Sequence, residues 1–364
     1  MQRRDFLKHG GIAGVLAASS APAFAQAQPE VKWRLTSSFP KSLDTIYGAS
    51  EQVAKIVAAA TDNKFQIRVF SAGEIVPGLQ VLDAVQNSTV EMGHTVSYYY
   101  FGKDPTFAFD AAVPFGLNAR QMDAWMNEGN GMKLMREFFA KYGVMNFPCG
   151  NTGAQMGGWY RKEIKTVADL KGLKMRIGGF AGQVLTKLGV VPQQFAGGDI
   201  YPALEKGTID AAEWVGPYDD EKLGFNKVAK FYYYPGWWEG GPQVSAYVSQ
   251  KAWGTLPKPY QAILESAMAE AHGDMTAKYD ARNPAALKRL VGSGTQLRPF
   301  SKPVLDACYQ AALEVYAETG AKNPAFKKMY EDMVKFRDEQ VLWFSVSDRF
   351  FDNYMATVKR GGAA

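Results

Sequence analysis

The sequence predicts an α/β protein built of two lobes that enclose a cleft. Strand-like and helix-like segments alternate in two separate blocks, and helical periodicity dominates the chain beyond them. The chain has 364 residues, of which 47% are hydrophobic and 21% charged, and this length and composition suit a globular protein with two packed lobes.

The first block has a βαβαβ order. Alternating apolar residues predict strands at 31–35, 65–70 and 90–94, and helical spacing predicts helices at 45–60 and 78–86. This order is typical of a mainly parallel sheet covered by helices, in which ligands bind at the carboxyl ends of the strands.

The second block repeats this pattern and predicts the second lobe. Strands are expected at 174–177, 190–192 and 209–213, and helices at 182–188 and 200–206. Two such blocks side by side indicate two lobes with a cleft between them.

The remaining segments are expected to join and cover the lobes. The strand-like segment 243–249 could return the chain to the first lobe, and helical patterns follow at 259–286 and 303–316. Apolar positions continue at helical spacing from 323 to 360, for about 50 Å if the helix is unbroken. This stripe is wider than one helix face, so it should pack on both lobes and could also pack on a neighbouring subunit. The predicted division is lobe I at 29–151 with 243–300, lobe II at 152–242, and a C-terminal helical region at 301–364.

The N-terminus has the order of an export signal. Paired arginines in residues 3–8 precede a weakly apolar stretch at 10–18, and Ala-Phe-Ala at 23–25 is typical of a cleavage site. Residues 1–25 resemble a twin-arginine signal, which predicts a periplasmic protein that folds before export. The alternative is a disordered basic tail. No other apolar run reaches the ~18 residues that a membrane span requires.

Charge and residue usage exclude several function classes. The chain has 41 basic and 36 acidic side chains, a formal charge of +5, and no run of four Lys or Arg, so nucleic-acid binding has little support. With two cysteines, Cys149 and Cys308, a disulfide framework is excluded, although one bond between them stays open. Beyond the leader only His94 and His272 remain, and no G-x-S-x-G or P-loop motif occurs. We therefore predict that the protein is not an enzyme.

Three charged residues stand in positions that suggest a binding site. Segment 231–242 places Glu239 among six aromatic residues, and a carboxylate in such surroundings needs a hydrogen bond, a partner charge or a cation. Glu213 closes an apolar strand, where the alternative is a solvated strand end. Arg176 ends another strand before two glycines. Its planar guanidinium group could bind a carboxylate there through two hydrogen bonds. The alternative is an ordinary surface arginine.

Five short motifs together carry a family resemblance: SSFP at 37–40, FSAGE at 70–74, DAV at 83–85, GLKMR at 172–176 and YPALEKGTID at 201–210. They resemble the solute receptors of tripartite ATP-independent periplasmic (TRAP) transporters. Within that family, four further motifs resemble the branch that binds 2-oxo acids such as pyruvate. They are HTVSYYY at 94–100, GGDIY at 197–201, EWVGPYDDE at 213–221 and YPGWWEGGP at 234–242.

The resemblance implies a fold, a ligand and a set of site residues. The fold is that of a two-lobed periplasmic binding protein with a long C-terminal helix spanning both lobes. Arg176 would pair with the ligand carboxylate, and a metal cation that the ligand also touches would be held by Gln155, Glu213, Glu239 and the backbone carbonyl of Trp214. The weaker candidates for the pocket wall are Tyr98, Tyr100, Asn151 and Phe180.

Charge counting independently favours a cation at this place. A monoanionic ligand, Glu213 and Glu239 sum to −3, against +1 from Arg176. In a dry cleft this excess requires a bound cation or protons on the glutamates. Oxygen donors favour a hard cation: calcium would balance the charge, and sodium would leave one negative charge.

The sequence therefore predicts a periplasmic receptor that closes on a small 2-oxo monocarboxylate and presents it to the TRAP membrane subunits. A receptor for 2-hydroxy acids such as lactate is the alternative within this class, because the same chelate serves both ligands. Two alternatives from other classes are a metal-dependent periplasmic lyase that uses Glu213 or Glu239 as base, and a purely structural dimer built on the C-terminal helix.

Overall fold

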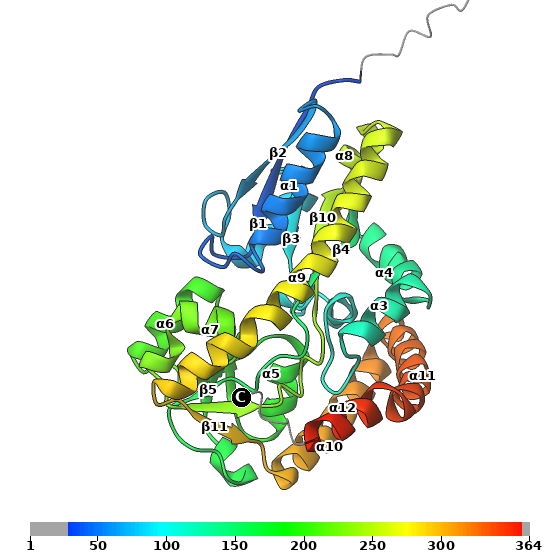
Figure 1. Cartoon of the computed structure of the whole chain (residues 1–364). Coiled ribbons are helices and arrows are strands. Elements are labelled where there is room, and N and C mark those ends of the chain that lie inside the picture. The colour runs from blue at the N-terminus through cyan, green and yellow to red at the C-terminus, as the bar shows by residue number, and fades with distance from the viewer. Residues whose placement is uncertain (1–27, 359–364) are drawn as a thin grey trace, which may run out of the picture.

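Two β-sheets, each covered by helices, form the two lobes of the protein (Figure 1). The computed structural model describes residues 28–358. The predicted export signal at 1–25 lies outside the described residues.

The first sheet confirms the first βαβαβ block. Its strand order is β2-β1-β3-β10-β4, in which β1 pairs in parallel with β2 and β3, whereas β10 runs antiparallel to β3 and β4. The strands are β1 (Val31–Ser37), β2 (Phe65–Phe70), β3 (Met92–Thr95), β4 (Val144–Asn151) and β10 (Gln243–Ser249). The helices of this block are α1 (Gly48–Ala60) and α2 (Val81–Gln86), the latter preceded by the 3₁₀ turn η1 (Gly78–Gln80).

The second sheet contains the second block. Its order is β11-β9-β5-β8-β6-β7, with β6 parallel to both β7 and β8. The strands are β5 (Trp159–Tyr160), β6 (Lys174–Arg176), β7 (Val191–Gln193), β8 (Ala211–Ala212), β9 (Phe231–Tyr234) and β11 (Gln296–Pro299). The helices are α5 (Gly179–Lys187), α6 (Gly197–Glu205) and α7 (Pro217–Leu223).

One boundary of the predicted lobes is wrong. The sequence pattern places residues 243–300 in lobe I, but β11 pairs with β9 in the second sheet. The chain returns there along α9 (Lys258–Gly292), which packs on α1 and β4 of the first lobe and on α7 of the second (Figure 1). Its 35 residues span about 50 Å, so a single helix connects the lobes. Periodicity predicted this helix but carries no information on which sheet the following strand joins.

The C-terminal helices pack on both lobes, as predicted. They are α10 (Lys302–Lys322), α11 (Pro324–Val346) and α12 (Asp348–Thr357), so the apolar stripe is helical but breaks at Ser347. In α11, the Phe326 ring lies 4.9 Å from that of Phe109 in lobe I and 5.1 Å from that of Phe180 in lobe II.

Short elements complete the structure. They are η2 (Ser97–Tyr100), η3 (Pro105–Asp110), α3 (Ala119–Asn127), α4 (Gly131–Ala140), η4 (Val167–Leu170), η5 (Phe225–Lys227) and α8 (Gln250–Thr255). Within residues 28–358, no helix has both the length and the apolar character that crossing a bilayer requires. Cys149 and Cys308 are free, buried thiols, so the bond between them that the sequence left open does not form.

A buried carboxyl group lies in the core of the first lobe. Asp110, at the end of η3, accepts hydrogen bonds from Asn146 Nδ2 at 2.6 Å and from Gln243 Nε2 at 3.3 Å. Burial raises the pKa of Asp110 to about 7, although hydrogen bonds from Ser245 and Asn146 lower it. Between about pH 4 and 7, the Asp110 carboxyl group is therefore protonated in the folded protein but ionised in the unfolded chain.

This proton makes stability fall as the pH rises from about 4 to 7, because in that range the folded state binds more protons than the unfolded state. Asp110→Asn cannot titrate and keeps an oxygen that accepts from Asn146. We expect its free energy of unfolding at pH 8 to exceed that of the parent by about 1–3 kcal/mol, with the difference vanishing near pH 4. Urea unfolding at both pH values measures this, with the exposed Asp83→Asn as control. A variant that is less stable than the parent at pH 8 would contradict it.

Candidate functional site

Three backbone segments from the second lobe meet at the predicted site. Met156 N–H donates to Val215 O at 3.0 Å, and Gln155 N–H donates to Glu239 O at 3.1 Å. Gly236 N–H donates back to Gln155 O at 2.9 Å. These bonds hold Gln155 between the segments that carry Glu213 and Glu239.

Two glycines permit this close approach. Gly158 has a φ of +82°, and a Cβ atom there would lie 2.6 Å from Ala212 O. A Cβ atom on Gly236 would lie 2.7 Å from Gln155 O. Any side chain at either position would push the three segments apart, so glycine is required for the geometry of the site.

Arg176 is buried and faces the site from the end of β6. Neighbouring strands place it beside Glu213, because Arg176 pairs with Ala212 in the register of β6 and β8. Its Nη1 donates to Glu213 O at 2.8 Å and forms an ion pair with Glu213 Oε1, and its Nε donates to Phe195 O at 3.2 Å. Arg176 is 1% exposed and Glu213 is fully buried, which excludes both the surface arginine and the solvated strand end.

Five buried polar atoms of this site have no hydrogen-bond partner within the described part of the chain. They are Arg176 Nη2, Gln155 Oε1, Glu213 Oε2, Glu239 Oε2 and Trp214 Nε1. Leaving such atoms unpaired costs roughly 1–3 kcal/mol each, so their concentration in one place indicates a ligand site rather than a packed core. Thr152 Oγ1 accepts from Gln155 Nε2 at 3.2 Å and thereby leaves the amide oxygen as the free atom.

The three free oxygens fit a hard cation, which prefers carboxylate and amide ligands. Among residues 28–358, no group of three or more His, Cys, Asp or Glu side chains could hold a metal. A cation here would therefore need the amide of Gln155 and a backbone carbonyl in addition to the two carboxylates.

The charges of the site shift the pKa values of its residues. Burial raises the pKa of Glu213 to about 7, although Arg176 opposes this. Burial also raises the pKa of Glu239 well above its usual value, and the charge of Glu213 raises it further. Burial disfavours the charged form of Arg176, but the nearby Glu213 outweighs this and the pKa rises above its ordinary value. The pair of glutamates thus resists ionisation unless a positive charge joins it.

Residues of both lobes enclose the site. A small cavity of about 10 Å³ lies beside it, which is barely the space of one water molecule, so the lobes are closed. The cavity is lined by Phe39, Ile46, Val96, Tyr98 and Tyr99 from the first lobe and by Thr152, Gln155, Trp214 and Val215 from the second. Trp214 also stacks on Arg176, whose Cζ lies 5.2 Å from the centre of the indole.

The weaker candidates have separate outcomes. Tyr98 lies at the site, since Glu239 and Glu213 both raise its pKa in addition to burial. Asn151 is buried nearby, but its side chain bonds to neighbouring backbone. It donates to Gly241 O at 3.0 Å and accepts from Gly153 N–H at 2.9 Å.

Two candidates face elsewhere, and those predictions are wrong. The hydroxyl of Tyr100 contacts Thr95 Oγ1 at 3.0 Å and accepts from Leu82 N–H at 3.1 Å inside the first lobe. The Phe180 ring lies 4.6 Å from that of Phe101 and packs against α10 and α11. In both cases core packing takes the side chain away from the cleft.

Sequence reasoning missed Tyr99, Phe39 and Thr152. Burial raises the pKa of Tyr99 to about 12, although the nearby charge of Arg176 lowers it. Tyr99 belongs to the same tyrosine motif as Tyr98, but the 3₁₀ turn η2 decides which rings face the cleft. Thr152 lies in the same loop segment as Asn151 and Gln155, two residues that the family resemblance places at the site, and it accepts a hydrogen bond from Gln155 Nε2.

The family described as bacterial extracellular solute-binding proteins, family 7, matches residues 36–323. The chain belongs to this family. It is a periplasmic solute receptor of the TRAP type, as the resemblance predicted, and not an enzyme. A monocarboxylate 2-oxoacid-binding periplasmic protein from Nostoc is 50% identical over 363 residues, which covers 98% of this chain and all of the relative.

Solved structures of TRAP solute-binding proteins share the fold. One from Bordetella bronchiseptica is 54% identical with a TM-score of 0.89, covers 90% of this chain and 98% of its own, and is a mixed-occupancy dimer with copurified calcium and picolinate. One from Colwellia psychrerythraea, with calcium and pyruvate, is 41% identical with a TM-score of 0.86, covering 89% of this chain and 99% of its own. One from Pseudoalteromonas atlantica, with sodium and pyruvate, is 40% identical with a TM-score of 0.86, covering 91% of this chain and 100% of its own.

Proposed function

We propose that this receptor binds a small 2-oxo monocarboxylate such as pyruvate, together with calcium or sodium, and delivers it to the membrane subunits of a TRAP transporter. The observation that carries this proposal is the buried guanidinium with one free nitrogen beside three unpartnered oxygens. The 2-oxoacid-binding relative and the two pyruvate complexes support it.

Each residue has a separate role in the proposed site. Arg176 would bind the ligand carboxylate with its free Nη2, and Tyr98 would help to exclude water. Gln155, Glu213, Glu239 and the carbonyl of Trp214 would hold the cation. When bound, the cation supplies the positive charge that the two glutamates and an anionic ligand lack, and a 2-oxo acid can chelate it through adjacent carboxylate and keto oxygens.

The charge of Arg176 can be tested by ligand titration. Arg176→Ala should weaken pyruvate binding by about 3 kcal/mol, roughly a hundredfold, because a charge-assisted hydrogen bond to the carboxylate is lost. Arg176→Lys keeps the positive charge but lacks the planar guanidinium group, so it should bind pyruvate more tightly than Arg176→Ala and less tightly than the parent protein. Calorimetry measures both, with the surface variant Arg34→Ala as control. Unchanged affinity in Arg176→Ala would remove this residue from the site, and lactate in the same panel tests the 2-hydroxy acid alternative.

The cation can be tested by removing it. After chelator treatment in sodium-free buffer, we expect pyruvate binding to weaken at least about tenfold and to recover when calcium is added, because the cation offsets the buried negative charge. Glu239→Gln should weaken this calcium response, whereas the surface variant Glu91→Gln should keep it. Full affinity in the cation-free parent protein would contradict the proposal.

We also propose that two copies associate through the C-terminal helices. In α11 and α12, Leu342, Trp343, Val346, Phe350, Phe351 and Tyr354 are 57–72% exposed. So many large, exposed apolar side chains within two successive helices are unusual for a soluble monomer, and the related Bordetella structure is a dimer.

Light scattering tests the association. The parent protein should have twice the mass of one chain, and the double variant Leu342→Glu, Phe350→Glu should have the mass of one chain, because buried charge opposes an apolar interface. Val291→Glu, another exposed apolar position, should stay dimeric. A monomeric parent protein would refute the association.

The export route is proposed to be the twin-arginine pathway. Support comes from the Arg3-Arg4 pair, the weakly apolar stretch and the Ala-Phe-Ala site in residues 1–25.

A further inference from the structure

The first turn of α7 carries two adjacent buried carboxyl groups, Asp219 and Asp220. They follow Trp214 by a few residues, so α7 continues directly from the segment that carries Glu213. Successive helix residues point about 100° apart, so the two carboxyl groups face different surroundings.

Asp220 faces the second sheet and anchors the site segment there. It accepts hydrogen bonds from Trp159 Nε1 at 2.9 Å, from Tyr232 OH at 2.7 Å and from Val215 N–H at 3.3 Å. Because Val215 adjoins Trp214, these bonds tie the first turn of α7 and the proposed cation-binding backbone to the second sheet.

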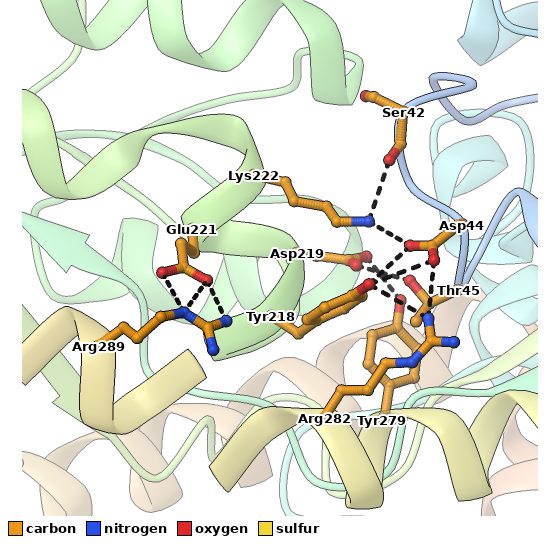
Figure 2. Close-up of polar contacts among 10 residues, drawn as sticks. All are labelled: Ser42, Asp44, Thr45, Tyr218, Asp219, Glu221, Lys222, Tyr279, Arg282 and Arg289. Carbon is orange, nitrogen blue, oxygen red and sulfur yellow. Dashed lines mark hydrogen bonds and ion pairs between the residues drawn. The ribbon is translucent and has the colours of Figure 1, made fainter. Parts of the chain in front are cut away.

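Asp219 faces the other lobe. Thr45 Oγ1, in the loop between β1 and α1 of lobe I, donates to Asp219 Oδ1 at 2.6 Å, and Tyr279 OH in α9 donates to Oδ2 at 2.7 Å (Figure 2). Both carboxylate oxygens are thus bonded, and Asp219 and Thr45 are 0% and 1% exposed. The bond between Thr45 and Asp219 joins the two lobes and cannot persist if they separate.

Weaker contacts surround this buried bond. Asp44 forms ion pairs with Lys222 of α7 and with Arg282 of α9, and Tyr218 OH donates to Asp44 at 3.1 Å (Figure 2). Asp44 is half exposed, and exposed ion pairs contribute little each. The buried hydrogen bond of Asp219 is therefore the stronger part of the contact.

We propose that Thr45 and Asp219 form a latch that stabilises the closed form of the receptor and slows ligand release without touching the ligand. The inference rests on the proposed binding of a 2-oxo acid between the lobes. A contact that exists only in the closed state shifts the population toward that state, and every ligand that requires closure then binds more tightly. Asp220 acts as a positioning residue, since it ties the latch to the site segment.

Thr45→Val tests the latch, because it removes the hydroxyl but keeps the shape. We expect pyruvate to dissociate about tenfold faster in stopped-flow measurements with calcium present, with little change in the association rate. Small-angle scattering should show a more open ligand-free ensemble. Thr61→Val is the matched control: Thr61 Oγ1 donates to Val57 O at 2.7 Å within lobe I, so its loss should lower stability but leave dissociation unchanged.

A double-mutant cycle with Asp219→Ala, which removes the acceptor oxygens, separates loss of the latch from a general loss of stability. The latch predicts that the effects of Thr45→Val and Asp219→Ala on dissociation are strongly non-additive, because each variant removes the bond between Thr45 and Asp219. Unchanged dissociation in Thr45→Val, or additive effects, would overturn the latch while pyruvate binding by the parent protein still stands. Absence of pyruvate binding in the parent protein would instead overturn the proposed function.

Discussion

The arrangement of the site depends on the burial of two glutamates and one arginine where water cannot solvate them. Arg176 offsets only one of the two negative charges, and burial holds the pKa values of Glu213 and Glu239 above their usual range. Such a site is unfavourable by itself and becomes favourable when positive charge is added. The same feature that costs stability makes the site selective for an anion that arrives with a cation.

The second lobe is built to keep these groups together. Short strands end at Arg176 and next to Glu213, and the segment around Gln155 is hydrogen-bonded to both glutamate-bearing segments. Glycines at 158 and 236 allow backbone to approach backbone where a side chain would not fit. The first lobe contributes mainly aromatic and aliphatic walls, which exclude water and so strengthen every charge interaction inside.

The related structures follow the same electrostatic logic. One holds calcium with pyruvate and another holds sodium with pyruvate, so homologous sites accept either cation. A site made of carboxylate, amide and carbonyl oxygens is selective for hard cations as a class, and the choice between them depends on ligand number and flexibility. Closure of the lobes adds interactions, such as that between Thr45 and Asp219, that lie outside the site and affect any ligand alike.

The two α/β blocks are visible in the amino-acid sequence, because alternating and helical periodicities follow directly from which faces are buried. The sequence also placed Arg176 and Glu213 at strand ends and Glu239 among tryptophans, since these local patterns are visible without long-range contacts. The family resemblance supplied Gln155 and the Trp214 carbonyl. Three features became visible in the folded protein alone: β11 joins the second sheet, the C-terminal helix breaks at Ser347, and Tyr98 and Tyr99 rather than Tyr100 face the cleft. These features depend on packing between segments far apart in the chain. The periodicity of a segment indicates which of its faces is buried, but not which distant segment packs against that face.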